Sequence, residues 1–205
     1  MALDEVGRKF SERLTTPLAR GIARTGLPPN ALTIGGLLLN VAVAYVIASG
    51  NLLLGGFLVL FSSAFDMLDG ALARATGRVT RFGALLDSSL DRLSEAVLLF
   101  GLLVLYMGQT QESVLIYATL VGSFMVSYVR ARSEGLNIQC KVGLTGRAER
   151  VILLAMGLIL GQVLIVLWIL AVVTNLTALH RILHVWRETG KPQTRAKEND
   201  ITKKP

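Results

Sequence analysis

The sequence predicts an all-α integral membrane protein with six transmembrane helices, preceded by an amphipathic helix at the membrane interface. Hydrophobic residues make up 52% of the 205 residues and charged residues only 17%, and the mean hydropathy is +0.56. The apolar residues form long runs separated by short polar turns. Such runs are typical of membrane-spanning helices, because about 20 apolar residues cross the hydrocarbon core. This composition excludes an ordinary soluble domain.

The chain begins with a segment that we expect to lie in the membrane surface. In residues 3–24, apolar side chains recur every three or four positions with Arg, Lys and Glu between them, as in an amphipathic helix. Pro17 should bend this helix, and the Pro-Pro pair at 28–29 should end it. Residues 1–29 are therefore predicted to form an interfacial helix and linker, with Asn30 capping the first spanning helix.

The next segment is predicted to be one transmembrane domain, and its end is followed by a polar tail. The tail, residues 188–205, is charged and is predicted to be a disordered cytoplasmic segment. The boundary between the last two spans is the least defined, which leaves five spans as the alternative. We place the domain at 30–187 and its spans at about 31–49, 52–73, 83–107, 113–133, 147–161 and 163–185.

The positions of the 21 Lys and Arg residues favour six spans over five. The turns at 50–51, 108–112 and 161–163 contain none of them. With six spans, all basic residues lie on one side of the membrane, whereas five spans would place the basic C-terminus on the other. Because Lys and Arg concentrate in cytoplasmic loops, we expect a multi-pass protein of the plasma membrane with both termini and the two large basic loops cytoplasmic.

Four aspartates interrupt the apolar chain within the stretch FDMLDGALARATGRVTRFGALLDSSLDRLSEA, residues 65–96. An acid at the centre of a spanning helix costs about 2.5–3.5 kcal/mol on insertion scales, so each needs a reason. Asp66 and Asp69 are three residues apart and share a face near the end of the second span. Asp87 and Asp91 are four apart at the start of the third span. The short loop between the spans predicts antiparallel neighbours whose carboxylates converge.

A hard divalent cation would relieve the repulsion among these carboxylates, and oxygen ligands suit Mg²⁺ or Mn²⁺. Mg²⁺ in proteins commonly sits between a few carboxylates and substrate phosphates, so a phosphate-bearing substrate is implied. Small side chains nearby would let a ligand approach the backbone, and Arg74 could pair with its phosphate. The alternatives are a structural carboxylate–arginine cluster and an ion-coupled membrane transporter. The confinement of the acids to one end disfavours a transporter.

The spacing of these residues resembles the signature of the CDP-alcohol phosphotransferases, membrane enzymes that move a phosphatidyl-type group from a CDP-linked lipid to an alcohol and release CMP. The matching pattern is Asp66-x2-Asp69-Gly70-x2-Ala73-Arg74-x8-Gly83-x3-Asp87-x3-Asp91. A prenyl-type transferase, which would typically show adjacent aspartates, fits less well.

The resemblance implies roles for individual residues. Asp91 would be the general base, and Asp87 a second catalytic residue. The metal would be bound by Asp66, Asp69, Asp87 and Asp91. The CDP-lipid would contact Asp66, Asp69, Gly70, Ala73, Arg74, Thr80, Gly83, Asn30 and Thr33.

A second basic cluster, in residues 126–136 and 143–150, bears on the acceptor. These segments resemble the phosphatidylinositol-phosphate synthase branch of the family and its archaeal ether-lipid counterpart. An excess of arginine suits a phosphorylated acceptor, because the guanidinium forms fixed forks with phosphate, although cytoplasmic arginines also follow from topology alone. The residues expected to bind the acceptor phosphate are Arg130, Arg147, Arg181, Ser127 and Arg150.

The expected reaction is therefore transfer from CDP-diacylglycerol, or an ether analogue, to inositol 1-phosphate, giving phosphatidylinositol phosphate. The alternative keeps this chemistry with glycerol 3-phosphate as acceptor, giving phosphatidylglycerophosphate. The family resemblance also implies a homodimer. The other expected partner is the lipid bilayer, and no nucleic acid is expected.

Overall fold

The computed structural model describes residues 21, 23, 26–140, 142–143 and 145–190. The predicted interfacial helix lies almost wholly outside these residues, as does the predicted tail beyond Gly190. Within the described part the chain is helical and contains no strand, which confirms the all-α class. The helices are α2 (Pro29–Ala48), α3 (Leu52–Ala75), α4 (Arg81–Leu105), α5 (Thr110–Gly135), α6 (Arg147–Ile159) and α7 (Val163–Thr189).

Most of these helices begin and end within three residues of the expected limits, for identifiable local reasons. Asn51 accepts a hydrogen bond from the backbone N–H of Leu54 at the start of α3. Thr80 caps α4 in the same way. The prediction for Asn30 was wrong: α2 already starts at Pro29, whose fixed φ suits the first turn, and it has no side-chain cap. Asn30 therefore lies inside that turn.

Four helices, α2, α3, α5 and α7, are long and apolar enough to cross a membrane, so the chain is a multi-pass membrane protein. The prediction of six such spans is met only in part. Helix α4 is long enough but carries charged side chains in its first half, from Asp87 to Glu95. Helix α6 has 13 residues, and at about 1.5 Å per residue it is shorter than the hydrocarbon core.

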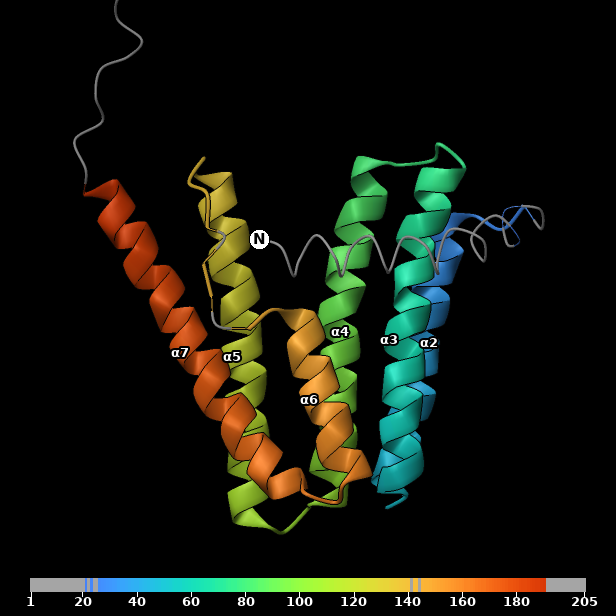
Figure 1. Cartoon of the computed structure of the whole chain (residues 1–205), viewed down its shortest axis with the longest axis vertical. Helices are drawn as coiled ribbons and strands as arrows, with labels where there is room; N and C mark the ends of the chain where they lie inside the picture. Colours follow the sequence, from blue (N-terminus) through green and yellow to red (C-terminus); the bar gives the residue numbers. More distant parts are fainter. Residues whose placement is uncertain (1–20, 22, 24–25, 141, 144, 191–205) are drawn as a thin grey trace, which may run out of the picture.

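The helices run side by side, with α2 packed against both α3 and α4, α5 against α7, and α6 against α3 and α7 (Figure 1). Direct packing of α3 on α4, which the short loop between them predicted, is largely absent. The two helices are instead joined through α2. Their ends near residues 76–80 are thus separated by a space into which side chains from three helices point.

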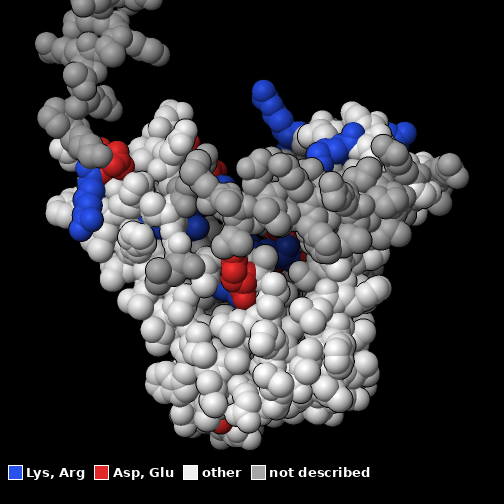
Figure 2. Space-filling view, viewed as in Figure 1, with Lys and Arg blue, Asp and Glu red and all other residues white. Residues whose placement is uncertain are grey.

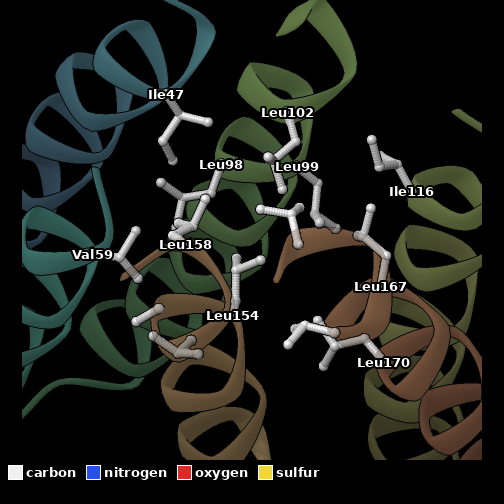
Figure 3. Packing of buried hydrophobic residues seen from close by; sticks show 14 of the residues in the cluster. Ile47, Val59, Leu98, Leu99, Leu102, Ile116, Leu154, Leu158, Leu167 and Leu170 are labelled. Atoms are coloured by element: carbon white, nitrogen blue, oxygen red, sulfur yellow. The ribbon is translucent and has the colours of Figure 1, made fainter. Parts of the chain in front are cut away.

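The larger hydrophobic core lies in the half of the bundle that ends at the turns without Lys or Arg, and a smaller cluster of Leu32, Ala71 and Leu72 joins α2 and α3 in the other half. Figure 2 shows the half with the larger core as almost free of charged side chains, whereas acidic and basic groups gather in the other half. All six helices contribute to the larger core, so even the short α6 is firmly packed at its C-terminal end. The central side chains of this core, shown in Figure 3, are Ile47, Val59, Leu98, Leu99, Leu102, Ile116, Leu154, Leu158, Leu167 and Leu170.

Glycines allow close helix contacts in this bundle. At Gly101 of α4, an added Cβ would lie 2.5 Å from the carbonyl oxygen of Ala44 on α2. At Gly122 of α5, it would collide with the side chain of Thr174 on α7. The absence of a side chain therefore sets how near these backbones approach.

We predict that Gly101→Ala destabilises the protein by about 1–3 kcal/mol, because the new methyl group meets backbone atoms that cannot turn away. Thermal unfolding of the detergent-solubilised protein measures the effect. The matched control is Gly135→Ala at the end of α5, where an added Cβ meets no atom within 4 Å. Equal melting temperatures for the two variants would contradict the close α2–α4 contact.

Candidate functional site

A first cavity that bears on the predicted site opens between the ends of α2, α3 and α4 and has a volume of about 270 Å³. Every residue predicted to contact the CDP-lipid lines it, except Asp66. Its lining residues are Pro29, Asn30, Thr33, Asp69, Gly70, Ala73, Arg74, Arg78, Val79, Thr80, Gly83, Ala84 and Asp87. The structure thus brings together residues separated by more than fifty positions in the sequence.

The N-terminal turn of α4 forms one wall of this first cavity. Thr80 Oγ1 accepts a hydrogen bond of 2.9 Å from the backbone N–H of Gly83. An added Cβ at Gly83 would lie 2.9 Å from Thr80 Oγ1 and 3.3 Å from Asn30 Oδ1, so only glycine fits without displacing them. A helix N-terminus favours anions through its dipole and free N–H groups, and Arg74 adds a positive charge nearby. This wall suits a phosphate group.

The second cavity lies among α4, α5, α6 and α7 and has a volume of about 230 Å³. All five residues predicted to bind the acceptor phosphate line it, although they come from three helices. Asp91 and Ser88 form the α4 side, and Asp87, one turn away on the same helix, lines the first cavity. The two cavities therefore adjoin along α4. The complete lining is Ser88, Asp91, Arg92, Glu95, Val126, Ser127, Arg130, Gly146, Arg147, Arg150 and Arg181.

The segment between α5 and α6 explains how arginines reach the interior. Helix α5 ends near the charged end of the bundle, whereas α6 begins well inside it (Figure 1). Arg181 of α7 ties this segment to α5, because its Nε donates to the carbonyl of Val142 at 2.8 Å and its Nη1 to that of Val126 at 2.6 Å. Arg147, the first residue of α6, lines the second cavity.

Arg147 forms ion pairs with two of the four aspartates. Its Nη2 lies 2.8 Å from Asp66 Oδ2 on α3, and its Nη1 lies 2.8 Å from Asp91 Oδ1 on α4. One guanidinium thus joins α3, α4 and α6, which the sequence did not predict. By contrast, the i, i+4 pair of Arg130 with Glu134, at 2.9 Å on the exposed face of α5, follows directly from the sequence spacing.

The four aspartates are spread along the boundary between the cavities. Asp69 and Asp87 line the first cavity, Asp91 lines the second, and Asp66 lies behind Arg147. In the part of the chain that the structure describes, no three acidic, His or Cys side chains converge closely enough to be recognised as a metal site. The donor chemistry nevertheless fits a hard divalent cation, because all four groups offer carboxylate oxygens from two facing helix ends.

Two residues of this region were missed by sequence reasoning. Glu95 of α4 forms a bidentate ion pair with Arg150 of α6, at 2.8 and 2.9 Å. Gly36 of α2 lies against Asp66, where an added Cβ would collide with Oδ1. Glu95 lies four residues after Asp91 on the same helix, and this spacing could have indicated that Glu95 belongs to the site. No local signal distinguished Gly36 from its neighbour Gly35.

Comparison with known proteins places this arrangement in a family. The family model described as CDP-alcohol phosphatidyltransferase matches residues 27–185. The phosphatidylinositol phosphate synthase of Mycobacterium tuberculosis strain H37Rv is 38% identical over 198 residues, covering 90% of this chain and 91% of the relative. The archaetidylinositol phosphate synthase of Pyrococcus horikoshii is 36% identical over 178 residues, covering 85% of this chain and 93% of the relative.

Solved structures of the M. tuberculosis phosphatidylinositol phosphate synthase share the fold. The crystal structure with CDP-DAG bound superimposes with a TM-score of 0.78 at 36% identity and covers 85% of this chain and 94% of the solved chain. The complex with manganese and citrate gives a TM-score of 0.79 at 36% identity, with 84% and 88% covered.

We predict that Gly36→Ala lowers the CDP-alcohol phosphatidyltransferase activity expected from the family match at least about tenfold, because the new methyl group pushes Asp66 away from Arg147, and small misplacements at a reacting site are costly. Gly35→Ala is the matched control, since its Cβ would meet only the ring of Phe65, at 4.0 Å. Initial rates of the two purified variants provide the comparison. Similar rates would show that the position of Asp66 against α2 is unimportant.

Proposed function

Because this chain belongs to the CDP-alcohol phosphatidyltransferase family, we propose that it transfers the phosphatidyl group of CDP-diacylglycerol, or of an ether analogue, to inositol 1-phosphate. The products are phosphatidylinositol phosphate and CMP. The family makes the protein a transferase of phospholipid biosynthesis. One observation carries the choice of acceptor: four arginines, drawn from α5, α6 and α7, line a cavity that adjoins the aspartates. Such a cavity suits a phosphorylated alcohol.

The first cavity would hold the CDP part of the donor. Arg74 and the N-terminal turn of α4 offer positive charge and N–H groups to the diphosphate. Gly70 and Gly83 keep the backbone accessible, since an added Cβ at Gly70 would meet only Arg74 Nη1, at 3.4 Å. Asn30 and Thr33 of α2 lie at the same cavity and would contact the nucleotide. The CDP-DAG complex of the mycobacterial relative supports this assignment.

The enzyme depends on a divalent metal ion, as its family does. We propose Mg²⁺ or Mn²⁺, held by Asp66, Asp69, Asp87 and Asp91. When bound, the ion would neutralise the diphosphate and stabilise charge on the departing CMP. The manganese complex of the relative supports this choice.

The second cavity would orient the acceptor for direct displacement. Arg130, Arg147 and Arg181 would bind its phosphate, with Ser127 and Arg150 at the same wall. Asp91 would take the proton of the attacking hydroxyl as the new oxygen–phosphorus bond forms and the bond to CMP breaks. Its carboxylate is oriented by Arg147 at 2.8 Å. The aspartates stand between donor and acceptor, so neither substrate needs to leave its own cavity.

The site would face the cytoplasm of a cell whose plasma membrane contains all six described helices as one domain. The basic residues of the described loops lie at the cavity end, whereas the turns after α2, α4 and α6 lack Lys and Arg, as the positive-inside rule requires. We also propose that residues 1–29 form an interfacial helix and linker and that residues 188–205 form a polar cytoplasmic tail. We further propose that the protein is a homodimer.

The acceptor can be tested by measuring CMP release with CDP-diacylglycerol, Mg²⁺ and one alcohol at a time. We expect turnover with inositol 1-phosphate, weak turnover with glycerol 3-phosphate, and none with unphosphorylated inositol, because the arginines would lack a partner. Robust turnover with glycerol 3-phosphate and none with inositol 1-phosphate would replace the proposed acceptor.

The role of Asp91 distinguishes the transferase from an ion-coupled transporter. We predict that Asp91→Asn lowers CMP release by at least about a hundredfold, the scale of a lost general base, while the protein still folds and shows a cooperative thermal transition. Glu112→Gln, in the first turn of α5 at the opposite end, should leave the rate unchanged. A wild-type protein that releases no CMP from any CDP-linked lipid would contradict the proposal.

A further inference from the structure

We infer that Glu95 and Arg150 form a positioning pair that sets the start of α6 against α4 and so holds Arg147 opposite Asp91. The inference rests on the proposed function, because it assigns the pair to acceptor binding through Arg147.

The two ion pairs between α4 and α6 form successive rungs. Asp91 and Glu95 are four residues apart on α4, and Arg147 and Arg150 are three apart on α6, so each pair lies on one face of its helix. The outer rung joins Asp91 to Arg147 at 2.8 Å. The inner rung joins Glu95 to Arg150 at 2.8 and 2.9 Å. A shift of α6 along α4 would break both rungs at once.

The two rungs differ in exposure and therefore in what they can do. The side chain of Arg150 is only 5% exposed and that of Glu95 12%. The side chain of Arg147 is 32% exposed. Two nitrogens of Arg150, Nε and Nη2, are already bonded to Glu95, and a buried bidentate pair fixes both position and direction. Arg147 retains access to solvent and substrate.

Helix α6 needs such a fixed point because its N-terminal end has little other support from α4. Its backbone packs closely on α3 and α7, not on α4. The apolar side chains through which α4 and α6 take part in the same core, among them Leu98 of α4 and Leu158 of α6, lie nearer the apolar end of the bundle (Figure 3). The cap at the first turn of α6 is local, since Glu149 Oε2 accepts from the N–H of Gly146 at 2.9 Å. Apart from the pair that Arg147 itself forms with Asp91, the inner rung is therefore the long-range restraint nearest Arg147 on the α4 side.

The test compares Glu95→Gln and Arg150→Lys in the full-length protein in lipid nanodiscs. Both variants keep the size of the side chain but lose the charged fork. We expect the KM for the phosphorylated acceptor to rise about tenfold, while the KM for CDP-diacylglycerol stays within about twofold. Arg132→Lys is the matched control, because Arg132 is exposed at the end of α5 and lines neither cavity. It should leave both constants unchanged.

A double-mutant cycle with Arg147→Ala separates positioning from a general structural role. If Glu95 acts through Arg147, Glu95→Gln should add less than about a twofold loss of kcat/KM in the Arg147→Ala background. A loss equal to that seen in wild type would overturn the inference. So would equal changes in both KM values, a drop in melting temperature with unchanged kinetics, or failure of both single variants to fold.

The same variants keep this inference separate from the proposed acceptor. If wild type used glycerol 3-phosphate and not inositol 1-phosphate, the proposed acceptor would fail. The cycle would then be measured with glycerol 3-phosphate and would still decide whether the inner rung positions Arg147.

Discussion

The ion pairs of Arg147 with Asp66 and Asp91 are the interaction on which the polar half of this protein depends. An apolar bundle tolerates buried carboxylates only where an opposite charge compensates them. One guanidinium does this for carboxylates on two helices and, as the first residue of α6, joins that helix to α3 and α4.

The division of the bundle into an apolar and a polar half serves the chemistry proposed for it. Leucine-rich packing at one end joins all six helices and gives the polar end a firm base. At the other end, α3 and α4 are joined through α2 instead of packing directly, and α6 starts deep in the bundle. Space for a nucleotide and space for a phosphorylated alcohol result from these two features. A lipid-linked donor and a water-soluble acceptor could thus meet at one membrane surface.

Sequence reasoning predicted most of the helices and most of the residues that line the two cavities, because both depend on local patterns. Hydrophobic runs and turn residues place the helix ends, and the aspartate spacing identifies the family. The short loop between α3 and α4 predicted antiparallel neighbours with converging carboxylates. Asp69 and Asp87 do line one cavity, but the two helices hardly pack on each other, since a short loop constrains only the helix ends. Helix α6 was expected to span the membrane, but it has only 13 residues. The structure shows that it begins inside the bundle and packs on α3 and α7.

What the sequence by itself determined is therefore the all-α membrane fold, the family, and the aspartates and arginines around the site. The tertiary structure decided how these charges are shared. In the folded chain Arg147 forms ion pairs with Asp66 and Asp91, and Glu95 forms one with Arg150. Arg181 donates hydrogen bonds to the backbone carbonyls of residues 126 and 142. The physical reason is that partners up to 81 positions apart leave no periodic signal in the chain, and only the packing of the helices selects which opposite charges meet.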